Sequence, residues 1–375
     1  MPWNALRLIQ LSLLGSVTLL PLLVLPAIVG ALVDYAGFSE ADAGWVAAVG
    51  FAGNAVAAIA VGLRIRHLNP RRLALWGTVT LLLFDALSMF INAIPVPLFL
   101  ALRAISGLGG AAAFAAVMAT IAASPAPERG YGVFMMFQFG FSALGLYLLP
   151  QVLPAIGAGG MYITLAAAAA LVLVMVPSVL DRAAAADDSA LELHMLLRPA
   201  ALLAMFGIGL YEAANLMHFT YADRIGVGFG LPDQRIGEIL GIATLLGMAA
   251  ALGVVWVANR FGQLLPLAVA LFLSIAALVY LQHPTGTETY AIAMCLLSIG
   301  WGFGLPYFHA VEARLDPGGS VVVAGGFFTA GGSAVGPALA AMLVRPDDYD
   351  LVMNVAIAIY ALVFVLMVFC VRKAR

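Results

Sequence analysis

Long apolar runs alternate with short polar breaks along the whole chain. Each run holds about twenty residues or more, which is the helix length needed to cross the hydrocarbon core of a bilayer. A membrane β-barrel would instead show alternating segments of about ten residues, so we expect an all-α fold. The eleven breaks, which predict twelve membrane-spanning helices, fall at residues 34–42, 64–72, 92–97, 124–130, 154–160, 181–198, 226–235, 259–263, 283–289, 316–319 and 345–350.

Composition supports an integral membrane protein. The chain of 375 residues is 64% hydrophobic and 10% charged, so it has more apolar surface than one soluble core could bury. The net charge of −2 and the lack of a basic run give no reason to expect a nucleic-acid partner. Cys295 and Cys370, the two cysteines, lie in apolar runs and predict neither a disulfide framework nor a metal site. We expect no cofactor.

The basic residues predict the orientation. With the N-terminus in the cytoplasm, thirteen arginines and lysines fall inside and three fall outside, which matches the positive-inside rule. Both termini are then cytoplasmic, and we expect a monomer in a plasma membrane, such as a bacterial inner membrane. The first apolar run is too long for a signal-peptide core and is expected to remain as the first span. The inner residues are Arg7, Arg64, Arg66, Arg71, Arg72, Arg129, Arg182, Arg198, Arg260, Arg314, Arg372, Lys373 and Arg375, and the outer ones are Arg224, Arg235 and Arg345.

The longest break divides the chain into two halves. We predict an N-terminal six-helix bundle at residues 1–180, a cytoplasmic linker at 181–198 and a C-terminal six-helix bundle at 199–375. A shift of 191 residues without gaps aligns glycines of the two halves, for example Gly50 with Gly241 and Gly109 with Gly300. This agreement favours a duplicated unit, and two parallel repeats around a cavity are a transporter architecture.

The fourth predicted helix carries an arginine among close-spaced glycines, in the stretch RAISGLGGA from residue 103 to 111. An arginine this deep in an apolar segment needs a partner in the protein and is therefore a candidate functional residue. The spacing Arg103, Gly107, Gly109 matches the R-x-x-x-G-x-G pattern of the fourth helix in the major facilitator superfamily, which this chain resembles. The resemblance implies two pseudo-symmetric six-helix bundles and transport by alternating access.

The loop after the second helix departs from that family's pattern. Where the family carries G-x-x-x-D-R-x-G-R-R, the chain keeps Gly62, Arg71 and Arg72 but has Arg66 at the acidic position. Its counterpart in the second half, around Asn259 and Arg260, is equally degraded. A charge relay of the family type is therefore not expected at this loop.

The resemblance implies that helices one, four, seven and ten line the cavity. In helix seven, Tyr211, Glu212, Asn215 and His218 lie within an arc of about 120°. Glu212 falls near the bilayer midplane, where a carboxyl is partly desolvated. We predict that Glu212 couples transport to protons, with His218 as a second proton group and Tyr211 and Asn215 as substrate contacts. The alternatives are a permanently protonated carboxyl bonded to Asn215 or to a neighbouring helix, and packing for His218.

Arg103 has two compatible interpretations. Helices three and four form a hairpin near Pro95, so Asp85 and Arg103 lie at similar depth and can form a structural charge pair. Arg103 can also meet the substrate, and as a cation in the cavity it would favour an anionic group.

Other polar residues are weaker candidates. His309, Glu312 and Arg314 near the inner end of helix ten are interpreted as an inner gate or as surface pairing. Asn54 and Gln138 either contact substrate along the path or form interhelical hydrogen bonds.

These features favour a secondary transporter and not an enzyme. We expect a proton-coupled carrier of a small organic anion or amphipathic metabolite. A proton-driven efflux pump for apolar compounds is the near alternative. An integral-membrane enzyme would need clustered ligands or a nucleophile with a base, and the five histidines are scattered. A receptor would usually carry a soluble domain. The sequence has no P-loop, so a gradient is the expected energy source.

Overall fold

The computed structural model describes residues 3–64, 67–181, 193–257, 260–283, 286–316 and 319–373. Arg66, Arg182, Asn259 and Arg375, which entered the motif and orientation arguments, lie outside these ranges, as does most of the predicted linker. The chain divides into two compact units, Met1–Asp187 and Asp188–Arg375. Each unit is described by itself.

The described residues form α-helices and short 3-10 turns, without a strand beyond one isolated bridge between Arg345 and Asp348. The first unit holds α1 (Ala5–Thr18), α2 (Leu20–Leu23), α3 (Leu25–Ala36), α4 (Glu40–Arg64), α5 (Pro70–Leu87), η2 (Ser88–Ala93), α6 (Val96–Ala122), α7 (Pro127–Leu173) and η3 (Val176–Ser178). The second unit holds α8 (Leu193–Leu196), α9 (Pro199–Thr220), α10 (Ala222–Gly228), α11 (Asp233–Val257), α12 (Leu264–Leu281), α13 (Thr287–Leu315), α14 (Ser320–Leu343) and α15 (Asp350–Lys373).

Two features reconcile these helices with twelve spans. Ten described helices are long and apolar enough to cross a membrane, and α7 is 47 residues long because it joins two spans. The junction is Gly157, whose φ of 62° and ψ of −175° belong to a region that is essentially restricted to glycine. The first span is assembled from α1, α2 and α3, so the described helices make twelve spans.

The first span is interrupted at two prolines. Pro21 and Pro26 each stand at the start of a new helical segment, α2 and α3. Proline cannot donate the backbone hydrogen bond that an uninterrupted helix requires. The span is therefore interrupted at both prolines, and Thr18 and residues after it lie at the edge of the cavity described below.

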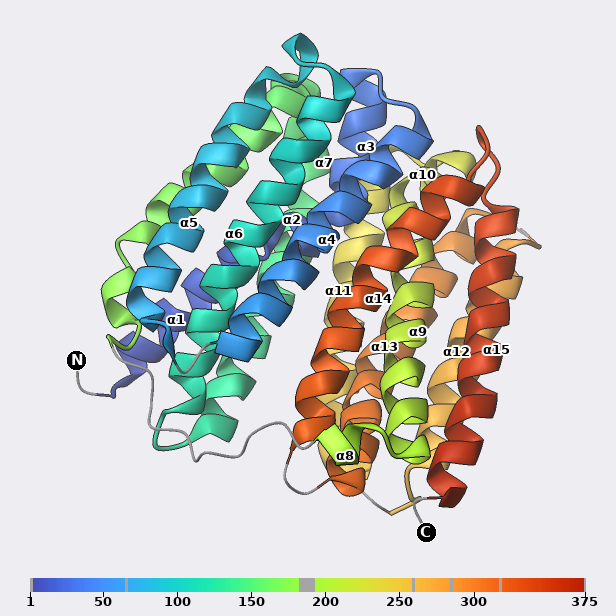
Figure 1. Ribbon diagram of the computed structural model, residues 1–375. Coiled ribbons are helices and arrows are strands. Elements are labelled where there is room, and N and C mark those ends of the chain that lie inside the picture. The colour runs from blue at the N-terminus through green and yellow to red at the C-terminus, as the bar shows by residue number, and fades with distance from the viewer. Residues whose placement is uncertain are drawn as a thin grey trace. The chain divides into compact units, whose positions relative to one another are not determined.

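The same helix pairs pack in both units (Figure 1). In the first unit α4 and α5 pack against α6, and in the second α11 and α12 pack against α13. A methyl group on Gly107 of α6 would overlap the carbonyl of Gly50, and one on Gly302 of α13 would overlap the carbonyl of Gly247. These contacts match Gly50 with Gly247, not with Gly241. The single ungapped shift of 191 residues therefore does not pair the glycines that make these equivalent contacts.

Candidate functional site

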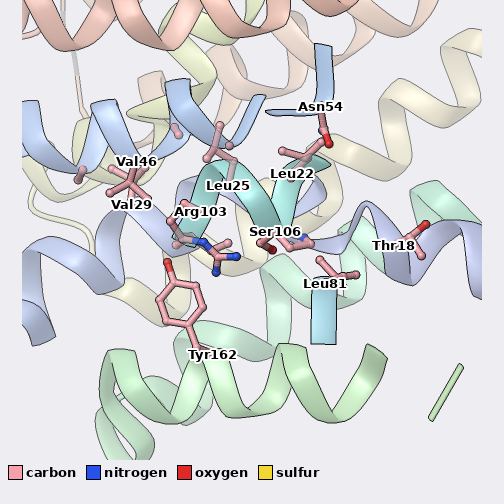
Figure 2. Close-up of a pocket in the computed structure, with 16 residues that line it drawn as sticks. Thr18, Leu22, Leu25, Val29, Val46, Asn54, Leu81, Arg103, Ser106 and Tyr162 are labelled. Atoms are coloured by element: carbon pink, nitrogen blue, oxygen red, sulfur yellow. The ribbon is translucent and has the colours of Figure 1, made fainter. Parts of the chain in front are cut away.

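A cavity of about 50 Å³ lies inside the first unit (Figure 2). A water-sized sphere needs about 10–15 Å³ by this measure, so the space holds a few waters or one end of a small molecule. Most of the wall is apolar, and the polar groups come from α1, α4, α6 and α7. The lining residues are Thr18, Pro21, Leu22, Leu25, Ile28, Val29, Ala43, Val46, Ala47, Gly50, Asn54, Leu81, Arg103, Ser106, Gly107 and Tyr162.

Arg103 forms a buried ion pair with Asp85. The guanidinium Nη2 of Arg103 donates to Asp85 Oδ1, and the hydroxyl of Ser106 donates to the same oxygen at 2.7 Å. The side chains of Arg103 and Asp85 are only 6% and 1% exposed. Burying a charge is costly unless it is paired and hydrogen-bonded, and here each charge compensates the other. The pair joins α5 to α6 across the hairpin and is neutral as a whole.

The guanidinium of Arg103 keeps free hydrogen-bonding capacity on its other side. Its carbon Cζ lies 4.8 Å from the centre of the Tyr162 ring, a cation–π arrangement. Among the described residues, neither Arg103 Nη1 nor the Tyr162 hydroxyl makes a hydrogen bond of ordinary geometry. Both residues line the cavity, and Figure 2 shows Tyr162 pointing toward the guanidinium. The arrangement can therefore donate hydrogen bonds to an acceptor that enters the cavity.

The other two candidates of the first unit are separated. Asn54 of α4 is half-buried and lines the cavity. Gln138 of α7 is also half-buried, but it is not one of the residues that line this cavity. Tyr162 was missed by the sequence analysis. Its one signal is a tyrosine within an apolar span, which needs a partner for its hydroxyl when it is buried.

Glu212 lies inside the second unit. Glu212 is 3% exposed, and its Oε1 accepts a hydrogen bond of 2.9 Å from the indole nitrogen of Trp301 in α13. The carboxyl is thus bonded to a neighbouring helix, while Asn215 is half-buried one turn further along α9. Trp301 was also missed by the sequence analysis, although an indole N–H in an apolar span usually requires an acceptor.

Tyr211 and His218 tie α9 to other helices of the second unit. The Tyr211 hydroxyl donates to the carbonyl of Gly300 at 3.1 Å, and its ring packs on Phe308 with ring centres 4.6 Å apart. The Nε2 of His218 lies 3.1 Å from the hydroxyl of Tyr360 in α15. Both side chains are buried, so this part of the polar face predicted for helix seven is engaged within the unit.

The C-terminal part of α13 brings His309 and Glu312 together. His309 Nδ1 lies 3.0 Å from Glu312 Oε2, and the side chains are 41% and 1% exposed respectively. The second carboxyl oxygen of Glu312 has no hydrogen-bond partner among the described residues and packs against Gly325 of α14. Arg314 is exposed. The structure therefore joins Glu312 to His309.

A metal centre is not indicated in the part of the chain that the structure describes, because no three His, Cys, Asp or Glu side chains gather there. Buried polar groups instead occur in both units. Arg103 and Asp85 pair in the first unit, and Glu212 and Trp301 are bonded in the second. Such groups inside a bundle of spanning helices usually mark solute or proton pathways.

Comparison with known proteins points to one family. The family model described as Major Facilitator Superfamily matches residues 11–337. A crystal structure of a mutant of the nucleoside transporter NupG superposes with a TM-score of 0.80 at 13% identity, covering 96% of this chain and 99% of the other. A second crystal structure of NupG gives a TM-score of 0.72 at 14% identity, with 98% of each chain covered. No curated protein sequence matches. At these identities the structural likeness concerns the fold.

Proposed function

Because this multi-pass membrane transporter belongs to the Major Facilitator Superfamily, we propose that it is a secondary active carrier that couples a small organic solute to protons. Alternating access in this scheme exposes the polar groups of each unit to the two sides of the membrane in turn. We also propose that the protein is a monomer in a plasma membrane, such as a bacterial inner membrane. The distribution of arginines supports cytoplasmic termini.

The buried position of Glu212 is the observation that supports proton coupling. The carboxyl is 3% exposed, and the partner found for it is the neutral indole of Trp301. A carboxylate in such surroundings is costly, and binding a proton removes the charge. The residue can thus take up a proton when it is open to one side of the membrane and release it on the other. His218, bonded to Tyr360, is the second candidate for this pathway.

The pair formed by Glu312 and His309 supports an inner gate. Glu312 and His309 form a bonded pair of which only the imidazole is partly exposed. We place the gate at this pair and assign Arg314, exposed beside it, to the surface of the same end. Tyr211 and Asn215 in α9, with Gln138 in α7, remain proposed substrate contacts, which substitution and binding can test.

Two solute classes follow from the cavity of the first unit. A small organic anion is the class expected if Arg103 meets the solute with its full charge. An uncharged polar solute, such as a nucleoside, is favoured by the pairing of Arg103 with Asp85. Nucleosides are candidates also because both structural neighbours are nucleoside transporters. The mostly apolar wall keeps an efflux pump for apolar compounds as a further alternative.

Gradient-driven accumulation in proteoliposomes tests the coupling. The wild type, Glu212→Gln and the control Glu288→Gln, whose residue is exposed at the start of α13, are compared with and without an imposed pH gradient. We expect Glu212→Gln to lose accumulation above equilibrium but to keep solute exchange, which needs no net proton movement. Glu288→Gln should accumulate solute like the wild type. Normal accumulation by Glu212→Gln would assign the proton to another residue.

A further inference from the structure

We infer that the cavity beside Arg103 binds an uncharged end of the solute that carries hydrogen-bond acceptors, such as a carbonyl, a hydroxyl or a ring nitrogen. The inference rests on the proposed function in one respect, namely that the bound molecule is the transported solute. Three features of the cavity support it: its charge, its free donors and its walls.

The charge of the cavity is already balanced. Arg103 donates to Asp85 Oδ1, and the hydroxyl of Ser106 donates to the same oxygen. An anion that approached the guanidinium would meet the Asp85 carboxylate one hydrogen bond away, and like charges brought together in a desolvated site repel strongly. Displacing Asp85 would leave that carboxylate buried without its cation. A neutral acceptor avoids both costs, because it uses only the face of Arg103 that the pair leaves free.

Within the described part of the chain, two buried groups at the polar end of the cavity make no hydrogen bond of ordinary geometry. These are Nη1 of Arg103 and the hydroxyl of Tyr162, whose residues are 6% and 1% exposed. A buried donor without an acceptor costs free energy that a ligand can recover. The amide of Asn54 adds both a donor and an acceptor at the same cavity. This set suits a ligand with several neutral acceptors and at least one donor.

The walls and the size define the rest of the ligand. Leu22, Leu25, Val29 and Val46 form an apolar side of the cavity. A volume of about 50 Å³ admits one end of a small molecule and not a whole metabolite. The cavity is thus a subsite for a small apolar head group that bears uncharged polar atoms.

Binding to the purified full-length protein, in detergent and without any gradient, tests the inference. The probes are two matched pairs that differ in charge: nicotinamide with nicotinate, and uridine with uridine 5′-monophosphate. We expect the neutral member of at least one pair to bind about tenfold or more tightly than its anionic partner, which corresponds to about 1.4 kcal/mol. Tighter binding of an anion, or no binding of any of the four probes, would overturn the inference.

Three variants test which residues cause the preference for the neutral probe. Asp85→Asn removes the competing charge at nearly constant size and should move the preference toward the anionic member. Tyr162→Phe removes only a hydroxyl and should weaken the neutral member several-fold. Asp42→Asn, in the half-buried first turn of α4 and outside the cavity lining, is the control and should bind like the wild type. If Asp85→Asn does not fold, Tyr162→Phe decides, and unchanged binding by Tyr162→Phe or by a folded Asp85→Asn would contradict the inference.

The outcome is separable from that of the proposed function. A wild type that prefers the neutral probe but never accumulates it under a pH gradient would refute proton coupling and leave the subsite intact. A wild type that accumulates nicotinate or uridine 5′-monophosphate in preference to the neutral partner would refute the subsite and leave proton coupling intact.

Discussion

Trp301 donates its indole N–H to the carboxyl of Glu212 over 2.9 Å and thereby links α13 to α9. The same two helices are joined by the hydroxyl of Tyr211, which donates to the carbonyl of Gly300 at 3.1 Å. The carboxyl of Glu212, which we propose for proton coupling, is therefore held at the contact between α9 and α13. These are the seventh and tenth spans, which the family resemblance implies line the transport pathway. A change in the state of this carboxyl can act directly on the packing of α9 against α13.

Replacing Trp301 by phenylalanine removes the indole donor and keeps an aromatic ring. We expect a loss of about 1–3 kcal/mol in the free energy of unfolding, because Glu212 loses its hydrogen bond inside the unit. Thermal unfolding of the purified protein measures the loss. Trp256→Phe is the matched control, because Trp256 in α11 is 74% exposed and should change stability by less than about 0.5 kcal/mol. Equal effects of the two substitutions would show that the bond between Trp301 and Glu212 contributes nothing.

The pair formed by Asp85 and Arg103 predicts strong non-additivity. Asp85→Ala leaves the guanidinium buried without its anion and should cost about 3–5 kcal/mol. The double variant, Asp85→Ala with Arg103→Ala, removes both charges and should be more stable than the sum of the single changes predicts. A double-mutant cycle in denaturant measures the coupling energy.

The control for this cycle is an exposed pair. Arg235 and Glu238 lie 2.6 Å apart near the start of α11, with side chains 59% and 38% exposed. Such surface pairs contribute about 0–1 kcal/mol, so the coupling energy measured there should be small. A coupling energy at Asp85 and Arg103 no larger than that of the surface pair would contradict a buried ion pair.

The twelve spans and the contact between Asp85 and Arg103 could be predicted from the sequence. Twelve spans follow from apolar length, which depends on local composition alone. The depth match between Asp85 and Arg103 follows from counting residues across one short turn. Trp301 and Tyr162 could not be assigned in this way, because their partners depend on how each helix is rotated about its axis. A nearly uniform apolar segment does not reveal that rotation, since almost every face of it is apolar.

The repeat illustrates the same limit. Shared glycines indicated a duplicated unit, but one fixed shift aligned Gly50 with Gly241, whereas close backbone contacts match it with Gly247. Insertions in the loops change the shift from helix to helix. The equivalent glycine in the other half is identified only by the carbonyl that each glycine contacts.

Gly157, at the junction of the two spans within α7, should tolerate no side chain. Its φ of 62° with ψ of −175° is unfavourable for any other residue, so Gly157→Ala should cost about 1–3 kcal/mol although space for a methyl group is available. Gly132→Ala in the same helix is the control. No atom lies within 4 Å of the added methyl group there, and alanine should stabilise the helix by about 0.5–1 kcal/mol. Thermal unfolding should therefore shift in opposite directions, and a neutral Gly157→Ala would rule out this backbone turn.

Gly325 and Gly326 provide an internal comparison at the proposed inner gate. A methyl group on Gly325 would overlap the carboxyl of Glu312, whereas nothing lies within 4 Å of a methyl group on Gly326. Gly325→Ala should therefore displace Glu312 from its bond with His309, lower stability by about 1–3 kcal/mol and slow transport. Gly326→Ala should leave both unchanged or slightly improved. Adding Glu312→Ala to Gly325→Ala should restore stability, because the smaller side chain makes room, but it should not restore gating. Transport and unfolding measured on all four proteins separate the two effects. If Gly325→Ala behaves like Gly326→Ala, the carboxyl of Glu312 does not rest on α14, and the gate must be sought elsewhere.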